Sequence, residues 1–477
     1  MDLMIPLKQG AGTPLYEQIY EYIKQEIRTG GLRAAVRLPS TRQLAENLKV
    51  SRSTTQLAYD QLLAEGYIES RPCRGYFVCE AENLLEISPA QGEKREGEGE
   101  AAAPKPGGEN GPWAVDFLPR GIDLDSFPYG VWRKISRNVM VDGNRDMFLS
   151  GDSQGERSLR EAIRDYLHAA RGVSCQADQV VVGAGSEYLL MLLANVLGRD
   201  RTVAMESPTY KQAYRVFDGQ GVRVLPVEMD GRGMRPDRLE ESGADIAYVM
   251  PSHQFPTGIV MPVGRRQELL QWAGRKKGRF LIEDDYDSEF RYRGKPVPSL
   301  QSMGMADRVI YLGTFSQSVA PAIRISYMVL PRKLVALYRR RAGFYASTVS
   351  RIDQAILCEF LTEGHFERHL NRMRAVYRSK HDLLLASLKA LDGDFQMSGE
   401  NAGLHVLLTH RSLGERRLSE LAAAAGVKVY GLSSYFIGEP EKGEGSRTVI
   451  LGYASLTEEE IREGAERLTR AWTAVSV

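Results

Sequence analysis

The chain has 477 residues, which is too long for one ordinary hydrophobic core and predicts two or three domains. Hydrophobic residues make up 43% of it and charged residues 26%, as in typical globular proteins, and the formal net charge of +1 neither favours nor excludes nucleic acid. No stretch approaches the length of a membrane span, the first residues lack the apolar run of a secretion signal, and the four cysteines form no CxxC pair. We therefore expect a cytoplasmic protein that contacts no membrane and has neither a disulfide framework nor a metal site.

The first predicted helix carries an apolar stripe. Leu15, Ile19, Ile23 and Ile27 recur at helical spacing. They follow Thr13-Pro14, which we interpret as a cap and a first helical proline. Gly30-Gly31 is the predicted end of this helix.

Two more helices and a hairpin follow. Ser40 and Ser51 each stand where a hydroxyl can cap the start of a helix. Tyr67–Ser70 and Tyr76–Cys79 then alternate like two short strands around a turn. Three helices followed by a β-hairpin are the element order of a winged helix-turn-helix domain.

Polar residues gather at the start of the third predicted helix. A recognition helix places this turn in the major groove of DNA, where Arg52 can bridge two acceptors of a guanine edge. Any single arginine is more simply a solvated side chain, but the ordered set favours DNA binding. The candidate DNA-binding residues are Arg42, Ser51, Arg52, Ser53, Thr54, Thr55, Arg71, Arg74 and Gly75.

The stretch LPSTRQLAENLKVSRSTTQLAYDQLLAEGYIESRPCRGYFV resembles the GntR-type winged-helix signature over essentially the whole of this head. The resemblance implies operator DNA as a partner. The hairpin turn Arg71–Gly75 departs from the small glycine-rich tip that is usual there.

Residues 89–112 break the globular pattern. They are rich in Gly, Glu, Lys and Pro and contain no aromatic or β-branched residue, so they cannot bury enough apolar surface to order themselves. We predict a head over residues 1–80, a flexible linker over 81–112, and a body over 113–477.

The body alternates strand-like apolar runs with helical patterns, which predicts an α/β fold with a mostly parallel sheet. In VVVGAGSEYLL, a strand, a glycine turn and a helix follow one another. The helix N-terminus at Gly185, Ser186 and Glu187 favours a phosphate. Alone this signal is weak, since many such joints carry glycine for steric reasons.

Further polar residues follow other strands of the body. RFLIEDDYDSEF places Asp284 and Tyr286 at the carboxyl edge of the sheet, where a buried carboxylate can hold a protonated ring nitrogen. Tyr210 can stack on a planar ring. A phosphate dianion suits Thr314, Ser316 and Arg324. Each residue alone is explained by a cap or a core position, but together they describe a site for a flat, phosphorylated, basic heterocycle.

The segments PSHQFPTG, EDDYDSEF and GTFSQSVAPAIR resemble the fold-type I aminotransferases, and with the head the whole chain resembles the MocR/GabR group of regulators. That resemblance implies pyridoxal phosphate as cofactor. Asp284 would contact its pyridine nitrogen, Tyr286 its phenolic oxygen and Tyr210 its ring face. The phosphate would lie among Gly185, Ser186, Thr314, Ser316 and Arg324, beside Glu187.

Two departures from the family pattern concern the chemistry. Gln317 stands where the family places the Schiff-base lysine, and an amide neither condenses with an aldehyde nor moves protons as an amine does. We therefore predict no usual transamination, and the sequence leaves open whether this glutamine is natural. Ile450 stands where an arginine often binds the substrate carboxylate, Arg447 is out of register, and Gln212 follows Tyr210 where an arginine is also expected. These positions leave the effector open among an amine, a peptide-like compound and the cofactor itself.

The leading interpretation is a homodimeric transcriptional regulator. Its head binds an operator, and its body responds to a small amino compound or to an adduct of pyridoxal phosphate. One alternative is a pyridoxal phosphate enzyme with an accessory DNA-binding head, which Gln317 argues against. The other is a DNA-binding protein whose body serves only for dimerisation.

Overall fold

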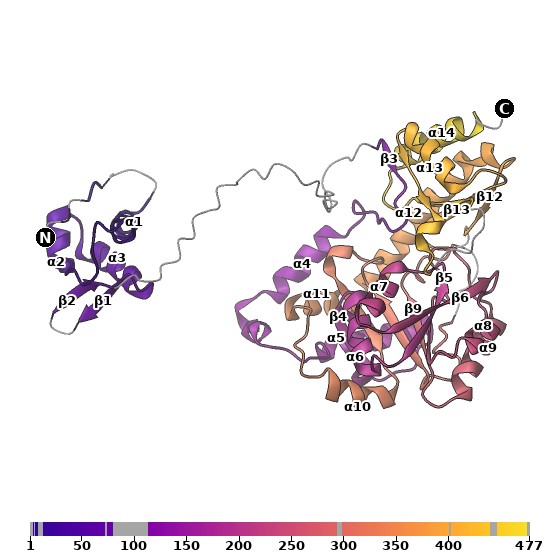
Figure 1. Ribbon diagram of the computed structural model, residues 1–477, viewed down its shortest axis with the longest axis horizontal. Helices are drawn as coiled ribbons and strands as arrows, with labels where there is room; N and C mark the ends of the chain where they lie inside the picture. The colour runs from indigo at the N-terminus through magenta and orange to yellow at the C-terminus, as the bar shows by residue number, and fades with distance from the viewer. Residues whose placement is uncertain are drawn as a thin grey trace. The chain divides into compact units, whose positions relative to one another are not determined.

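The computed structural model describes residues 3, 5–7, 13–71, 74–79, 113–292, 298–399, 402–438 and 446–474. The chain divides into two compact units, within residues 1–106 and 107–477 (Figure 1). The predicted linker over 81–112 lies outside the described residues.

The first unit is a winged helix-turn-helix domain, as the sequence predicts. The two strands of its hairpin pair antiparallel, with Ile68 opposite Val78 and Arg71 opposite Gly75. Each strand bound therefore differs by one residue from the predicted one. Its apolar stripe, including Ile19 and Ile23, is buried against Leu44 and Leu62. Its elements are α1 (Leu15–Arg28), α2 (Thr41–Leu48), α3 (Arg52–Ala64), β1 (Ile68–Arg71) and β2 (Gly75–Val78).

Hydroxyl caps fix the starts of two of these helices. The Ser40 side chain accepts a hydrogen bond from the Gln43 amide at 3.1 Å, and Ser51 accepts one from the Thr54 amide at 3.2 Å. The predicted cap of the first helix is wrong. Pro14 itself is the residue before α1, and the Thr13 carbonyl instead accepts from the Gln18 side chain.

The second unit is built on an eight-stranded sheet with the order β4-β11-β10-β9-β8-β5-β6-β7. The pairs β5–β6, β5–β8, β8–β9 and β9–β10 are parallel, whereas β11 runs antiparallel to both of its neighbours. The mostly parallel sheet predicted from the sequence is confirmed. The strands are β4 (Val180–Ala184), β5 (Thr202–Ser207), β6 (Arg223–Asp230), β7 (Gly233–Met234), β8 (Ile246–Val249), β9 (Phe280–Asp285), β10 (Val309–Thr314) and β11 (Ile325–Val329).

Helices cover both faces of this sheet. On β4, Val181 packs into one apolar cluster while Val180 and Val182 pack into another, as expected when alternate side chains point to opposite faces. Helices α6, α7 and α10 contribute to the first cluster, and α4, α5, α11 and α12 contribute to the second. Their bounds are α4 (Tyr129–Val139), α5 (Arg157–Arg171), α6 (Ser186–Leu197), α7 (Lys211–Gly219), α8 (Pro236–Glu241), α9 (Val263–Arg275), α10 (Arg332–Arg341), α11 (Arg351–Thr362) and α12 (His365–Ser387).

A smaller antiparallel sheet, with the order β12-β13-β16-β15, packs with α13 and α14 to form the C-terminal part of this unit (Figure 1). The first strand after the undescribed segment, β3 (Val115–Asp116), pairs with β14 in this part of the molecule. Within the described ranges, none of the helices combines the length and the apolar character needed to cross a membrane. The remaining elements are β12 (Phe395–Ser398), β13 (His405–His410), α13 (Glu415–Ala424), β14 (Val427–Lys428), β15 (Tyr430–Gly431), β16 (Thr448–Gly452) and α14 (Glu458–Thr473).

A buried ion pair fastens the loop between β3 and α4. Lys380 Nζ lies 2.9 Å from Asp123 Oδ2, and the two side chains are 10% and 9% exposed. Burial raises the pKa of Asp123, but the hydrogen bonds from Lys380 and from the Ser126 amide outweigh it and hold that pKa below its ordinary value.

We predict that Lys380→Met destabilises the second unit by about 3 kcal/mol, because it leaves the Asp123 carboxylate buried without its partner. The measurement is urea denaturation of the full chain followed by tryptophan fluorescence, since all four tryptophans (113, 132, 272 and 472) belong to this unit. The double variant Asp123→Asn with Lys380→Met should recover part of the loss. An unchanged midpoint for the single variant contradicts the prediction.

Candidate functional site

All ten residues predicted to surround a cofactor line one cavity of about 270 Å³ in the second unit. Small-molecule sites commonly start at about 300 Å³, so the cavity suits a compact ligand. It lies where β9 and β10 end and α6 begins. The ten residues are Gly185, Ser186, Glu187, Tyr210, Asp284, Tyr286, Thr314, Ser316, Gln317 and Arg324; the cavity is also lined by Arg120, Met250, Phe255 and Pro321.

One end of the cavity gathers donors for an anion. Gly185 precedes α6 with φ 95° and has no side chain to cap the helix; among the first amides, that of Glu187 donates to its own carboxylate. A Cβ at Gly185 would lie 2.4 Å from Arg324 Nη2, so any larger residue here would push that guanidinium from its position. The Thr314 hydroxyl accepts from the Ser316 amide at 3.1 Å and from the Ser326 hydroxyl at 2.8 Å.

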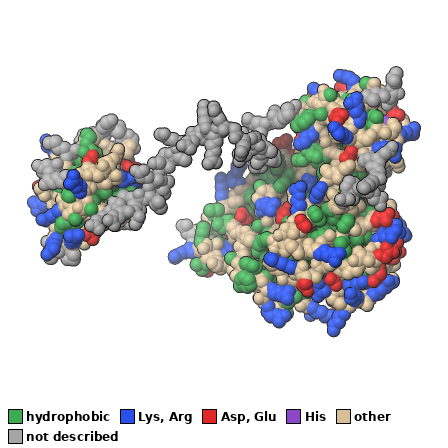
Figure 2. All heavy atoms as spheres, viewed as in Figure 1, with side chains coloured by type: hydrophobic (Ala, Val, Ile, Leu, Met, Phe, Trp, Pro, Cys, Tyr) green, Lys and Arg blue, Asp and Glu red, His purple; other side chains and the backbone are tan. Residues whose placement is uncertain are grey.

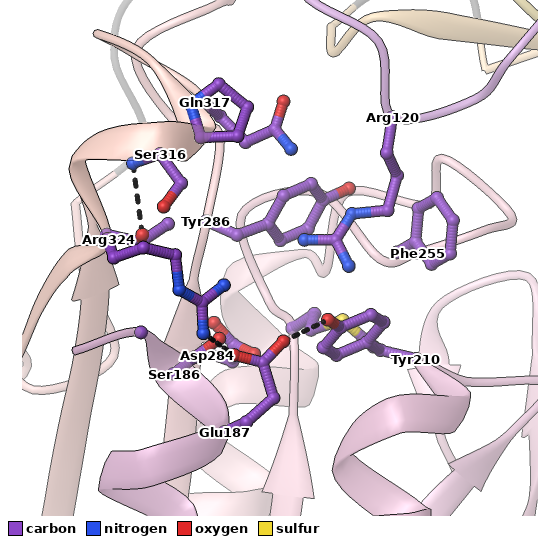
Figure 3. Close-up of a pocket in the computed structure, with 14 residues that line it drawn as sticks. Arg120, Ser186, Glu187, Tyr210, Phe255, Asp284, Tyr286, Ser316, Gln317 and Arg324 are labelled. Carbon is purple, nitrogen blue, oxygen red and sulfur yellow. Dashed lines mark hydrogen bonds and ion pairs between the residues drawn. The ribbon is translucent and has the colours of Figure 1, made fainter. Parts of the chain in front are cut away.

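Glu187 lies at this same end, as predicted, but its carboxylate takes part there as well as its amide. It pairs with Arg324 Nη2 at 3.2 Å and accepts a hydrogen bond from the Tyr210 hydroxyl at 3.0 Å (Figure 3). Burial raises its pKa, but its own amide, Tyr210 and Arg324 together hold that pKa below the ordinary value. An incoming phosphate would therefore compete with Glu187 for Arg324.

A buried acid at the end of β9 also lines the cavity. Asp284 is 6% exposed and accepts a short hydrogen bond from the Tyr248 hydroxyl. Burial raises its pKa to about 6, so a positively charged group placed beside it would be favoured. The Tyr286 hydroxyl lies 2.9 Å from His253 Nδ1, which is 2.7 Å from Asp287 Oδ2.

Gln317 lines the cavity with 7% of its surface exposed. No lysine is found among the described residues that line the cavity. The other two departures lie elsewhere. Ile450 is buried in β16, opposite Leu407 and Tyr430, and Gln212 is exposed on α7.

Four lining residues, Arg120, Met250, Phe255 and Pro321, were missed by the sequence analysis, and two of them carry side chains that suit a polar aromatic ligand. Arg120 lies on the loop between β3 and α4, with its guanidinium carbon 4.2 Å from the centre of the Tyr210 ring and 5.9 Å from that of Phe255. Phe255 follows β8 in the segment PSHQFPTG. Neither position belongs to a periodic apolar pattern, and no local motif marked Arg120 as a cavity residue.

The head presents the start of α3 at its surface. Arg52 and Ser53 are exposed, and Thr54 is partly exposed. Ser51 is engaged as the helix cap and lies within 2.8 Å of both the Ser53 and the Thr54 hydroxyl oxygens. Thr55 is fully buried and donates to the Thr41 carbonyl at 2.8 Å, so its side chain joins α3 to α2 instead of facing outward.

Further basic residues lie beside α3 and on the hairpin (Figure 2). Arg42 is exposed on α2 and pairs with Glu46 at 3.1 Å. Arg71 pairs with Glu69 at 2.6 Å, and its guanidinium lies 4.5 Å from the Phe77 ring centre. Arg74 is exposed, and Gly75 has φ 99° at the end of the turn, whose residues 72 and 73 lie outside the described residues.

Arg37 and Leu57 add to the surface of the head beyond the predicted set. A Cβ at Gly75 would lie 3.5 Å from Arg37 Nε, so this exposed arginine stands beside the hairpin turn. Leu57, expected on the apolar side of α3, is 55% exposed.

Comparisons with known proteins agree with this architecture. Residues 15–78 match the family "Bacterial regulatory proteins, gntR family", and residues 128–468 match "Aminotransferase class I and II". The chain is 37% identical to the HTH-type transcriptional regulator YdeL of Bacillus subtilis, over 99% of this chain and 100% of that protein. It is 34% identical to the probable rhizopine catabolism regulatory protein MocR of Rhizobium meliloti, over 99% and 96%.

A solved structure shows the same fold for the second unit. The α-aminoadipate aminotransferase LysN of Thermus thermophilus, complexed with N-(5'-phosphopyridoxyl)-L-leucine, superposes with a TM-score of 0.66 at 27% identity, covering 76% of this chain and 92% of that one. The fold is thus that of a winged-helix head with a fold-type I aminotransferase body. The chain belongs to the MocR-type family of HTH transcriptional regulators, whose body comes from the class I and II aminotransferases. The body's family implies a binding site for pyridoxal phosphate.

Proposed function

We propose that this protein is a dimeric regulator that binds operator DNA through its head and senses pyridoxal phosphate, or its adduct with an amino compound, without transaminating it. The observation that carries the proposal is one cavity that brings together all ten predicted residues, with Gln317 and no lysine in its described lining.

The polar groups of the cavity fit the non-covalent parts of pyridoxal phosphate. The α6 N-terminus, Thr314, Ser316 and Arg324 would hold the phosphate dianion. The buried Asp284 carboxylate would hold a protonated ring nitrogen, and Tyr286 would donate to the phenolic oxygen. Tyr210 would cover the ring face once the Arg120 guanidinium, which lies 4.2 Å from the centre of the Tyr210 ring, moves aside.

The cofactor, when bound, supplies an aldehyde that condenses with primary amines. Covalent attachment and proton transfer by this chain would both need an amine at residue 317, and the Gln317 amide can perform neither reaction. The cavity would therefore bind its ligand reversibly, as a sensor requires. Binding controls the head only if the ligand has different affinities for two arrangements of the dimer.

The DNA-binding part of the proposal rests on the exposed start of α3. Arg52 and Ser53 would face the major groove, while Arg42, Arg74 and Arg37 would contact phosphates. Thr55 is left out of this set because its hydroxyl is used inside the head. Ser51 and Thr54 would shape the same turn.

Exposed apolar side chains support a homodimer. Met140, Val141, Phe148 and Leu149, in the segment that follows α4, are 51–74% exposed. Such a concentration of large apolar groups marks an interaction surface, and a second copy of this chain is its proposed occupant. Sedimentation of the full chain measures this state directly.

The central test compares this protein with Gln317→Lys in a pyridoxal phosphate titration. We expect weak, dialysable binding to the protein itself and covalent retention, fixed by borohydride reduction, in the lysine variant. Absorbance and intact mass report the two outcomes. If neither protein binds the cofactor, the sensor function is wrong and the body is a dimerisation scaffold.

We predict opposite effects of Asp284→Asn on stability and on binding. The pKa of Asp284 is raised from 3.8 to about 6, so its ionisation opposes folding, and stability falls as the pH rises through this range. The asparagine variant should therefore be more stable than the parent at about pH 8, by at most about 3 kcal/mol, yet bind pyridoxal phosphate at least about tenfold more weakly.

Glu206→Gln is the matched control for this prediction. Glu206 is fully buried on β5 outside the cavity lining, and burial raises its pKa to about 7. Its substitution should stabilise the protein in the same pH range and leave cofactor affinity unchanged. Melting temperature and titration measure both quantities, and equal losses of affinity in the two variants would refute the role of Asp284.

For the head, Arg52→Ala should weaken binding to an operator selected from genomic fragments by about 10- to 100-fold, because a bidentate base contact is lost. Arg28→Ala removes an exposed arginine from the end of α1 and serves as the control, with an expected change below about twofold. Gel-shift titration at fixed salt measures both. Equal affinities for the Arg52 and Arg28 variants would show that α3 does not read the operator.

A further inference from the structure

We propose that Arg120 recognises a carboxylate of the effector, so that the cavity selects adducts of pyridoxal phosphate with amino acids over adducts with simple amines. This inference rests on the proposed cofactor site and names the class of compound that the site takes.

Arg120 reaches the cavity from the side opposite the anion-binding end. Figure 3 shows its guanidinium between Tyr286, Phe255 and Tyr210, facing across the cavity toward Arg324 and Ser316. A ligand whose phosphate lies at Arg324 would therefore extend toward Arg120 with its other end.

Arg120 forms no ion pair with a carboxylate among the described residues, although the Tyr210 hydroxyl and, at longer range, the Asp284 carboxylate act on its charge. Three buried arginines of this unit each pair directly with a carboxylate: Arg160 with Asp152, Arg265 with Asp230, and Arg279 with Glu240. Arg266 is satisfied differently, by three backbone carbonyls. Arg120 has neither kind of partner in the described part of the chain.

The aromatic rings of Tyr210 and Phe255 offset part of the desolvation of this cation, since a guanidinium over a ring face is attracted by its quadrupole. They leave the in-plane N–H donors without an anionic acceptor. A ligand carboxylate matches those donors in charge and in bidentate geometry.

The loop that carries Arg120 is held in place on both sides. The Gly452 amide donates to the Phe117 carbonyl at 3.0 Å, and a Cβ at Gly452 would lie 2.0 Å from the Leu118 carbonyl oxygen. After Arg120, the buried pair of Asp123 with Lys380 fixes the loop again. A guanidinium on such a support binds with little loss of backbone entropy.

This placement accounts for the missing arginine of β16. Ile450 is fully buried in the strand and lines no part of the cavity, so it offers nothing to a ligand. The cation instead comes from the loop that β16 supports through Gly452. The cavity has thus kept a positive group while changing the segment that supplies it.

The test uses two reduced, stable probes that differ by a single carboxylate: N-(5'-phosphopyridoxyl)-L-alanine and N-(5'-phosphopyridoxyl)ethylamine. Calorimetric titration of the full chain should show at least about tenfold tighter binding of the alanine probe. Arg120→Gln should remove this preference by weakening the alanine probe alone, and Arg120→Lys should keep part of it. Arg324→Gln, at the phosphate end, should weaken both probes equally.

The possible failures are distinguishable. If neither probe binds, the proposed cofactor site is wrong and this inference falls with it. If both bind equally to the unaltered protein, or if Arg120→Gln weakens both to the same degree, the cofactor site stands and the carboxylate role of Arg120 is overturned. Unchanged tryptophan-fluorescence melting of Arg120→Gln confirms that a loss of binding is not a loss of folding.

Discussion

The buried pair between Arg171 and Asp285 organises the ligand cavity from outside it. Arg171, at the end of α5, donates from Nε to Asp285 Oδ2 at 2.8 Å and from Nη2 to the Ser252 hydroxyl at 2.7 Å, and both charged side chains are at most 5% exposed. It therefore joins the end of β9 to the segment that follows β8. Because successive strand residues point to opposite faces, fixing Asp285 on one side presents Asp284 to the cavity on the other.

The cavity itself balances charges that the fold would otherwise have to neutralise. Glu187 pairs with Arg324, and the Tyr248 hydroxyl donates a hydrogen bond to Asp284. Burial nevertheless raises the pKa of Asp284, so this acid is protonated more readily than an exposed one. A ligand with a dianionic end and a cationic ring would replace these internal partners with its own. Binding would then exchange contacts instead of only adding them, which keeps affinity moderate and occupancy reversible.

The sequence predicted what depends on local spacing. The winged-helix order, the caps Ser40 and Ser51, the mostly parallel sheet and the common cavity of Asp284 and Arg324 all follow from periodicity, capping and strand-end chemistry. What it missed depends on tertiary packing. The Thr55 hydroxyl is of the kind that contacts DNA, but its position on α3 directs it into the head. Leu57, in contrast, is apolar yet exposed. Arg120 comes from a loop whose path is set by contacts with β16 and Lys380, distant in sequence, which no local pattern encodes.

The pairing of β3 with β14 decides where the head is tethered. The chain that arrives from the head enters the body at β3, and this strand belongs with the small C-terminal part and not with the large sheet. The same short stretch continues directly into the loop of Arg120. Because β3 pairs with β14 and runs directly into the Arg120 loop, any displacement of the small part relative to the large sheet would act on that loop through the backbone itself. The covalent path from the first strand of the body to the cavity is only the short stretch from Val115 to Arg120.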